Sequence, residues 1–313
     1  MRYGRVSALL RAEGAKDRRR HDAHRQLVQP LLARPRVADR AEPRPMSRPT
    51  ELITMLEDVW NSLDSLLVTL DESQWKTATE LPGWSVQDTL SHLVSSEKGL
   101  QGEPGTAHRA SNLSNVKNPI GEFNEHEVDA RRSLPGATVF AEWKEIQAKR
   151  RATFATADDT YFAREMMTPT GPGTFADFLH IRVMDAWVHE QDIRRALSKP
   201  GNQGGAAAQH SLSRFVRSLP MVVGKRAKAP DGSIVTVRVV GAVQAEFHVA
   251  TEAGRAKLVD TASQQQCVIS IDSEAYFALC CGRQFWKPGD PRVSISGDAD
   301  LAGRVLSNFN VMI

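Results

Sequence analysis

The residues best suited to chemistry lie in one stretch, from His180 to Arg195. The stretch contains neither Gly nor Pro, so we expect one helix that follows Thr174 and continues to about Leu197. At about 100° per residue, Asp185 falls on the apolar face of this helix, within about 60° of four apolar residues: Phe178, Ile181, Val188 and Ala196. His189 and Asp192 follow on the same face.

Polar groups on a core-facing side need partners, because burying an unpaired carboxylate or imidazole is costly. A carboxylate and a His one helical turn apart suit a divalent metal, and a structural ion pair would also compensate the cost. On the opposite side of the helix, Glu190, Gln191 and Arg194 are expected to lie in water.

Other helices must bring further ligands to this stretch. Apolar residues at three- and four-residue spacing predict a helix from Thr50 to about Leu70, and Ser85 with Asp88 predicts the capped start of a second helix. Further helices are expected at residues 120–133 and 137–155, and a loop or hairpin at 166–173. The long helices favour a four-helix bundle, which places metal sites between facing helices. In such a bundle His92, at the flank of the second helix, can meet Asp185 and His189.

The last third of the chain has a different pattern. After an expected helix at residues 206–219, alternating apolar residues predict strands at 233–240, 246–250, 267–271 and 292–296. Helices are expected at 273–281 and 299–309. The fold class is therefore α+β with two domains, a helical bundle over residues 46–203 and a smaller α+β domain over 204–313.

Charge separates the first 45 residues from the rest of the 313-residue chain. Residues 1–45 carry 12 Lys and Arg against 5 Asp and Glu, whereas the whole chain has a net charge of only +3. The remainder is therefore mildly acidic. We interpret residues 1–45 as a disordered basic leader, or as the product of a start site placed too early, with Met46 as the true start. Targeting and binding to nucleic acid or a membrane surface are the alternatives for this segment.

No apolar run approaches the length of a membrane span, and no signal peptide is apparent. Cys267, Cys280 and Cys281 lack metal-ligand spacing and are expected in the core. Together these features predict a reduced, cytoplasmic protein, with no nucleic acid or membrane as partner of its folded part. Trp84 and Trp187 are interpreted as packing residues.

Three segments resemble the mycothiol-dependent maleylpyruvate isomerase family. They are Leu81-Pro82-Gly83-Trp84-Ser85-Val86 with Ser91-His92-Leu93, then Asp185 to Arg194, and finally Gly282-Arg283 with Val293 to Leu301. The resemblance covers residue 46 to the C-terminus. It implies a DinB-like metal-binding four-helix bundle, followed by a domain similar to sterol carrier proteins.

The resemblance also implies a divalent metal, most readily Zn²⁺, held by His92, Asp185 and His189. Family members carry Glu at the first position of the acidic-x-x-x-His pair, and Asp185 is shorter by one methylene group. Asp still ligates zinc at about 2.0–2.2 Å, so the site is retained while its depth and substrate preference can differ.

Such a metal would deprotonate a coordinated thiol. In the family the co-substrate thiol is mycothiol, whose sulfur adds to an activated double bond, allows rotation and then leaves. Asp192 is expected either to fix the tautomer of His189 or to pair with Arg194 or Arg195 on the surface. Arg182 would neutralise Asp185, hold an anionic substrate or form a structural ion pair. Arg283 is a candidate to reach a substrate carboxylate across the domain cleft.

Two classes of function remain open from the sequence. The first is a metal-dependent mycothiol isomerase or thiol S-transferase acting on a small electrophile. The second is a non-catalytic binding protein, stabilised by metal, that carries an apolar ligand in its C-terminal domain; a carrier should release a ligand on extraction with an apolar solvent. A third idea is DNA association through residues 1–45, which should be lost when that leader is deleted. The substrate and the oligomeric state cannot be derived from the sequence.

Overall fold

The computed structural model describes residues 48–262 and 264–312. A helical N-terminal region is followed by a C-terminal region built on a sheet, so the expected α+β fold class is confirmed. The prediction for the leader, residues 1–45, lies outside the described residues. No helix of the described residues is long and apolar enough to cross a membrane.

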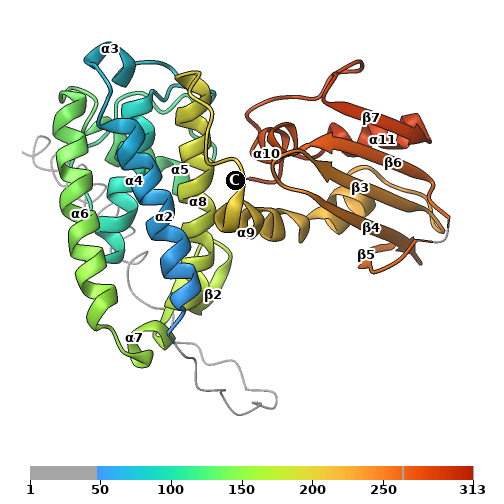
Figure 1. The fold of residues 1–313 in the computed structure, drawn as a ribbon, viewed down its shortest axis with the longest axis horizontal. Coiled ribbons are helices and arrows are strands. Elements are labelled where there is room, and N and C mark those ends of the chain that lie inside the picture. Colours follow the sequence, from blue (N-terminus) through green and yellow to red (C-terminus); the bar gives the residue numbers. More distant parts are fainter. Residues whose placement is uncertain (1–47, 263, 313) are drawn as a thin grey trace, which may run out of the picture. The chain divides into compact units, whose positions relative to one another are not determined.

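Four long helices form the helical region: α2 (Thr50–Leu67), α4 (Val86–Leu100), α6 (Gly136–Thr156) and α8 (Phe175–Ala196). Each packs against two of the others, in the closed order α2, α8, α4, α6 (Figure 1). The helices enclose an apolar core in which Trp60 and Trp143 meet edge to face. This ring of contacts is a four-helix bundle.

Shorter elements connect the long helices. They are α3 (Glu72–Trp75), α5 (Pro119–Asp129), α7 (Asp159–Ala163) and the antiparallel hairpin of β1 (Glu165–Thr168) and β2 (Gly171–Thr174). Helix α5 packs on α4 and therefore adds a second layer outside the bundle. The hairpin leads directly into α8.

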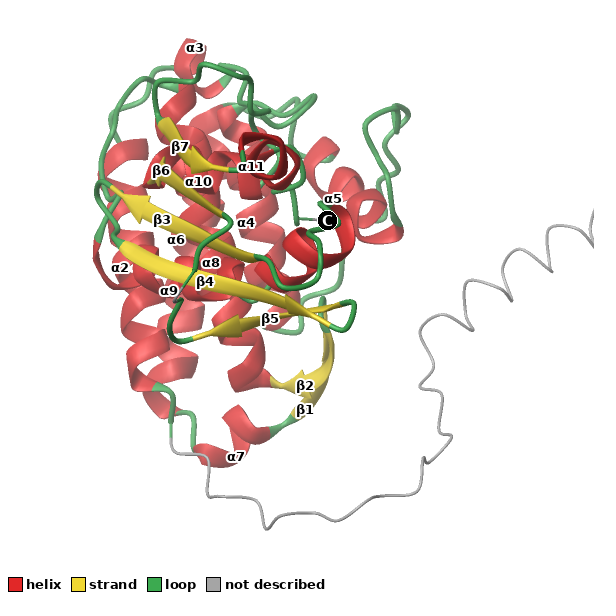
Figure 2. Ribbon diagram, turned by 90° about the vertical axis from the view of Figure 1, so that its right-hand side faces the viewer, coloured by secondary structure: helices red, strands yellow, loops and turns green. Residues whose placement is uncertain are grey.

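The C-terminal region begins with α9 (Gly205–Val216) and a π-helical turn, η1 (Met221–Arg226). Its five strands are β3 (Ile234–Val240), β4 (Ala245–Glu252), β5 (Arg255–Val259), β6 (Cys267–Asp272) and β7 (Val293–Gly297). They lie in the order β5-β4-β3-β6-β7, which Figure 2 shows from bottom to top. Only the β3–β6 pair is parallel.

Two helices accompany this sheet, α10 (Ser273–Cys280) and α11 (Ala299–Leu306), and both pack on β6. Alternate residues of the central strands are buried, including Val235, Val237, Ile269 and Ile271. The core also contains Cys267, Cys280 and Cys281, as expected from their lack of ligand spacing.

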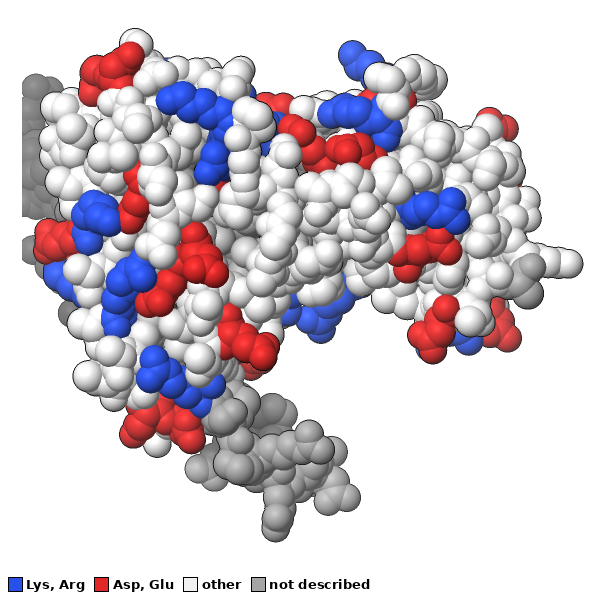
Figure 3. Space-filling model, viewed as in Figure 1, with Lys and Arg blue, Asp and Glu red and all other residues white. Residues whose placement is uncertain are grey.

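Acidic and basic side chains alternate over the face of the molecule in Figure 3. Among the described residues, many charged side chains form ion pairs, such as Lys149 with Glu103 and Arg151 with Glu57. This mixture agrees with the nearly balanced charge of the sequence after residue 45.

Candidate metal centre

Two capped helices position the candidate metal ligands. Ser85 and Asp88 exchange hydrogen bonds at the start of α4, and Thr174 and Asp177 do the same at the start of α8. Each reciprocal capping box satisfies backbone N–H groups that the first helical turn leaves free. The helix starts are thereby fixed, and so is the rotation that turns His92 toward α8.

His92, Asp185 and His189 meet between α4 and α8, as their sequence positions predicted. The Nε2 atom of His92 lies 3.4 Å from Oδ2 of Asp185, and Nε2 of His189 lies 3.6 Å from Oδ1 of the same carboxylate. One potential ligand atom from each residue lies within 4.8 Å of the other two. The side chains of both histidines are more than 90% buried.

These separations fit a divalent ion. Ligand atoms about 2.0–2.1 Å from a tetrahedral zinc lie about 3.3–3.4 Å from one another. The two distances to Asp185 are near this value but involve its two different oxygens, and the ligand atoms of the group lie within 4.8 Å of one another. Three protein ligands leave a fourth position for water or another ligand, which is the donor set of catalytic rather than structural zinc sites. The residues present therefore fit the metal that the resemblance implied.

A second sphere of charged residues surrounds His189. Its Nδ1 atom lies 3.1 Å from Oδ2 of Asp192, a fully buried carboxylate. Asp192 also accepts hydrogen bonds from Arg195, at 2.6 Å, and from Nε and Nη2 of Arg283, each at 3.0 Å. The two roles predicted as alternatives for Asp192 therefore occur together. The carboxylate contacts His189 and also forms an ion pair with Arg195.

Arg182 connects the centre to the core of the bundle. Its Nη1 donates to Oδ2 of Asp185 at 2.6 Å, and its Nε donates to Glu97 at 2.9 Å. Glu97 has no exposed surface and also pairs with Arg150 at 2.9 Å. The ion-pair alternative for Arg182 therefore has direct geometric support, while a role in holding substrate stays a prediction.

The pKa values of His92 and Asp185 favour metal binding. Burial lowers the pKa of His92 despite the opposing effect of Asp185, so its ring is neutral at pH 7. Burial would raise the pKa of Asp185, but Arg182 and the two histidines outweigh it and hold that pKa well below the usual range. Burial likewise opposes ionisation of Asp192, yet His189 and Arg283 lower its pKa. Neutral imidazoles and ionised carboxylates are the ligand forms that metals require.

Trp84 lies beside both histidines, whereas the sequence predicted only a packing role for it. Its ring centroid is 5.5 Å from that of His92 and 6.3 Å from that of His189. Its Nε1 donates to Glu125 at 2.8 Å, and Glu125 pairs with Arg132 at 2.6 Å.

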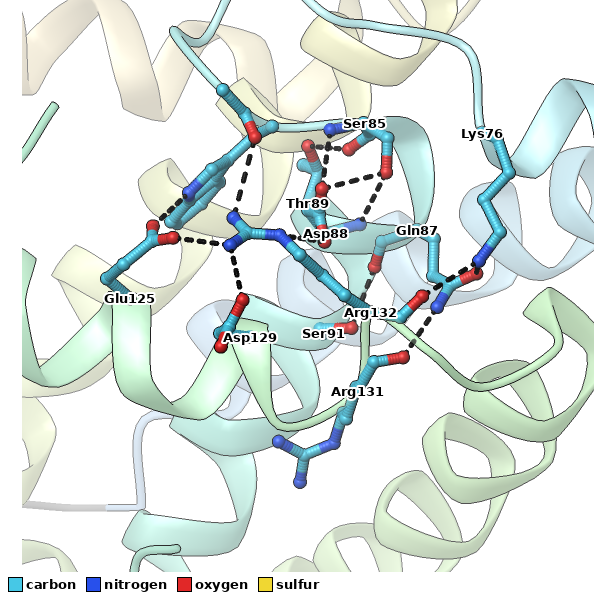
Figure 4. Close-up of polar contacts among 12 residues, drawn as sticks. Lys76, Ser85, Gln87, Asp88, Thr89, Ser91, Glu125, Asp129, Arg131 and Arg132 are labelled. Atoms are coloured by element: carbon cyan, nitrogen blue, oxygen red, sulfur yellow. Dashed lines mark hydrogen bonds and ion pairs between the residues drawn. The ribbon is translucent and has the colours of Figure 1, made fainter. Parts of the chain in front are cut away.

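Arg132 joins α5 to the start of α4. Figure 4 shows its guanidinium between Asp88, Glu125 and Asp129. Asp88 belongs to the capping box of α4, so one arginine ties the helix that carries His92 to the carboxylate that accepts from Trp84. No residue spacing indicated this network, because its members come from three separate segments.

The expectation that Glu190, Gln191 and Arg194 lie in water is wrong. Glu190 has no exposed surface, Gln191 is 7% exposed, and the Arg194 side chain is 13% exposed. The reason is that α2 and α9 pack against this side of α8, so the helix is enclosed on nearly every face. Glu190 accepts hydrogen bonds from Ser62, Arg194 and Asn202, which compensate its burial.

The predicted site residues thus fall into one connected group. His92, Asp185 and His189 meet directly, Asp192 and Arg182 contact them, and Arg283 from the C-terminal region reaches Asp192. Arg283 uses its Nε and Nη2 donors on Asp192 and its Nη1 on the carbonyl of Cys281. A contact between Arg283 and a substrate stays a prediction.

Comparisons with known proteins agree with this arrangement. Residues 56–194 match the sequence model of the mycothiol maleylpyruvate isomerase N-terminal domain, and residues 209–304 match that of the C-terminal domain of the same family. Two relatives are uncharacterized proteins of Mycobacterium tuberculosis, from strains CDC 1551 / Oshkosh and ATCC 25618 / H37Rv. Each is 22% identical over 199 residues, which cover 62% of this chain and 75% of the relative.

Two solved structures are also similar to this chain: the mycothiol-dependent maleylpyruvate isomerase, with a TM-score of 0.52, and a histidine-to-alanine mutant of it, with a TM-score of 0.51. Both are 14% identical, and the match covers 79% of this chain and 92% of each of those chains. At this identity the likeness shows the fold. The two sequence models together span most of the described chain, and the protein belongs to the mycothiol-dependent maleylpyruvate isomerase family.

Proposed function

We propose that this protein is a metal-dependent enzyme that uses mycothiol to isomerise, or to transfer its sulfur to, a small electrophile. The observation that carries the proposal is the meeting of His92, Asp185 and His189 at distances that suit a divalent ion, most readily Zn²⁺. Membership of the family supports an isomerase role.

Two neutral imidazoles and one carboxylate leave a divalent metal with net positive charge, so a bound metal would lower the pKa of a coordinated thiol. The residues of the chain have supporting roles. Asp192 holds His189 in the tautomer whose Nε2 is free to bind. Arg182 fixes the Asp185 carboxylate from the core side.

The proposed reaction is balanced without a further reagent. A carbon–sulfur bond forms while the double bond of the electrophile becomes single, and rotation about that bond follows. Elimination of the sulfur restores the double bond and regenerates the thiol. For a saturated electrophile the same sulfur would displace a leaving group instead. Arg283 is proposed to interact with an acidic group of the substrate when Asp192 does not fully occupy its donors.

The first experiment measures metal content by mass spectrometry on protein purified without a His-tag. We expect about one divalent ion per chain in the wild type, and its loss in His92→Ala and His189→Ala. His210→Ala is the matched control, because His210 is half-buried, stacks on His180 and lies outside the ligand group. If the wild type binds no zinc, even after incubation with zinc, the metal proposal is contradicted. His92, Asp185 and His189 would then be interpreted as a buried structural group.

The second experiment tests the reaction. Metal-loaded protein should convert an electrophile with an activated double bond, such as maleylpyruvate, only when mycothiol is present. A protein that binds metal but converts no electrophile, and releases an apolar molecule on solvent extraction, would favour the carrier alternative.

A further inference from the structure

Two histidine rings stack where α9 packs against α8 (Figure 1). The ring of His180, from α8, and that of His210, from α9, are nearly parallel, with an interplanar angle of 16° and centroids 5.1 Å apart. Both residues are half-buried, so each is partly accessible from solvent. Neither ring belongs to the group of candidate metal ligands in the described residues.

A hydrogen bond fixes the tautomer of neutral His210. Its Nε2 atom lies 3.1 Å from the backbone carbonyl of His180, and because a carbonyl can only accept, Nε2 carries the proton. The Nδ1 atom of His210 and both ring nitrogens of His180 have no hydrogen-bond partner in the described part of the chain. Three ring nitrogens can therefore donate to a ligand when the two rings are protonated.

Two arginines continue the row that His210 begins on α9. Arg214 follows His210 by four residues, and Arg217, the residue that ends this helix, follows it by seven. This spacing places the three residues on one face of the helix. The guanidinium groups of Arg214 and Arg217 form no ion pair and no hydrogen bond with the residues that the structure describes. We call His180, His210, Arg214 and Arg217 the α8–α9 basic cluster.

The α8–α9 basic cluster carries more positive than negative charge. Its opposing carboxylate is Asp177, whose Oδ2 accepts two hydrogen bonds of 2.8 Å from Thr174 in the capping box of α8. With Asp177 counted in full, the net charge is about +1 when both rings are neutral and about +3 when both are protonated. Other half-buried arginines, such as Arg132 and Arg195, pair directly with carboxylates. A ligand with two negative charges would supply the missing counter-charge.

The pKa values reflect the same excess of positive charge. Burial lowers the pKa of Arg214, and Arg217 adds to this effect. Burial also lowers the pKa of His180, and the three other members of the cluster lower it further. Asp177 opposes both changes. Burial and Arg214 lower the pKa of His210, while its hydrogen bond to His180 raises it. A bound anion would favour the protonated rings, because an opposite charge within about 4–6 Å stabilises a charged group.

We propose that the α8–α9 basic cluster binds a phosphate-type dianion, either free inorganic phosphate or the phosphate group of a small molecule. Arg214 provides a permanent charge and a planar fork of donors that matches phosphate oxygens. The protonated rings of His180 and His210 donate through the nitrogens that lack protein partners. The anion also offsets the repulsion between two charged rings 5.1 Å apart. This site does not depend on the reaction proposed for the metal centre.

NMR of the full chain, labelled with carbon-13 in its histidine rings, tests the proposal. Inorganic phosphate is titrated at about pH 6.5, near the ordinary pKa of histidine, and sodium chloride keeps the ionic strength constant. We expect saturable shifts of the His180 and His210 signals, which are identified by their absence in His180→Gln and His210→Gln. The pKa of both rings should rise when phosphate is bound.

Two results of this titration would overturn the proposal. One is a response of His180 and His210 that does not saturate, or that an equal ionic strength of chloride also produces. The other is a shift confined to His92 and His189, which would place the phosphate at the candidate metal centre.

Arg214→Gln tests the anchor of the site. We expect the Kd for phosphate to rise at least about tenfold, because hydrogen bonds between charged groups are the strong ones. The matched control is Arg238→Gln, which removes a half-exposed arginine paired with Glu246 on the sheet and should leave the Kd unchanged. Equal phosphate affinity of wild type and Arg214→Gln would contradict the proposal. If Arg214→Gln does not fold, Arg217→Gln at an exposed position replaces it. That variant should weaken binding several-fold, and an unchanged affinity would again contradict the proposal.

Further ligands identify the kind of anion. A lower Kd for glycerol 3-phosphate than for inorganic phosphate would show that the site serves a phosphorylated molecule, whereas an equal or higher Kd would show that it serves free phosphate. Both results support a phosphate site. Acetate, which carries a single charge, should bind at least about tenfold more weakly than phosphate. Equal affinity for acetate and phosphate would contradict the assignment to a phosphate-type dianion.

Discussion

At Asp192 a single buried carboxylate serves three partners. It contacts Nδ1 of His189 and accepts hydrogen bonds from Arg195 and Arg283. The two arginines compensate its burial, and the contact with His189 selects one tautomer of that ring. The carboxylate that contacts the candidate ligand His189 is thus held by Arg283, which lies 91 residues after Asp192 in the chain.

Asp192→Asn should weaken zinc binding. The amide keeps the size of the side chain but loses the charge, so the partners that hold His189 are weakened. Loss of such outer partners lowers metal affinity by about 10–100-fold. Competition with a chromophoric zinc chelator measures the change, and Asp300→Asn on the exposed start of α11 serves as the control. Wild-type affinity in Asp192→Asn would mean that His189 needs no such support.

Trp84 provides a second test at single-residue scale. Trp84→Phe keeps an aromatic ring near His92 and His189 but removes the Nε1 donor to Glu125. We expect a loss of about 1.5–3 kcal/mol in the free energy of unfolding, the net value of one hydrogen bond to a charged group. Urea denaturation measures this loss of stability. In a Glu125→Ala background, Trp84→Phe should cost less, because the hydrogen bond is then already absent.

The candidate ligands and their neighbours on α8, Asp192 and Arg182, could be predicted from the sequence, whereas the contacts of Trp84 could not, for a physical reason. Asp185 and His189 are one turn apart on one helix, so periodicity alone brings them together. Trp84 reaches the same place from a loop, and its partner Glu125 comes from α5. Contacts of this kind depend on how separate segments pack together. The spacing of residues within one helix or strand does not predict them.

Helix α4 shows how charge inside the bundle holds three elements together. Glu97 lies on its apolar face and pairs with Arg150 of α6 and Arg182 of α8, all three buried. The Nη2 atoms of both arginines have no hydrogen-bond partner within the described part of the chain. Glu97 is therefore the carboxylate that the two buried arginines share.

Glu97→Gln should destabilise the fold by about 3–5 kcal/mol, the cost of breaking a buried ion pair from one side. Chemical denaturation followed by circular dichroism measures the free energy of unfolding. The matched control is Glu145→Gln on α6, whose side chain is 68% exposed and whose pair with Lys149 contributes about 0–1 kcal/mol. Equal effects of the two substitutions would show that the buried network contributes little.

The boundaries of helices were predicted correctly from the sequence where a capping motif determines them. The capping boxes at Ser85 and Thr174 start α4 and α8 where they were expected. Four short elements were missed. The helices α3 and α7 have only four and five residues, too few to show an apolar period. The edge strand β5 is mostly exposed and its residues do not alternate, and η1 has a π-helical turn that no apolar period indicates. The burial of Glu190 was missed because it depends on α2 and α9.

For the molecule as a whole, acid stability should depend on Glu142. Arg131 lowers the pKa of this α6 residue from 4.5 to about 2, in spite of burial and with help from Lys98. A folded pKa below the unfolded value means that the ionised form stabilises the fold. This contribution is complete above about pH 5 and is lost as the pH falls toward 2.

Glu142→Gln should therefore flatten the dependence of stability on pH between about 5 and 2. Thermal unfolding across that range, compared with wild type, measures the slope. The variant should be less stable than wild type at pH 7, and the difference should narrow in acid. A difference that stays constant with pH would show that the pairing with Arg131 and Lys98 does not stabilise the fold.

The three buried cysteines affect how the protein behaves in a thiol-rich environment. Burial raises the pKa of Cys267 to about 11 and that of Cys281 to about 12, and it also raises the pKa of Cys280 well above its usual value. Protonated, inaccessible sulfur does not attack the disulfide of an oxidised small thiol. We therefore expect these three cysteines not to form mixed disulfides with such a molecule. In a labelling experiment, alkylation of these cysteines would proceed only as often as the native structure opens, so its rate would report the frequency of that opening.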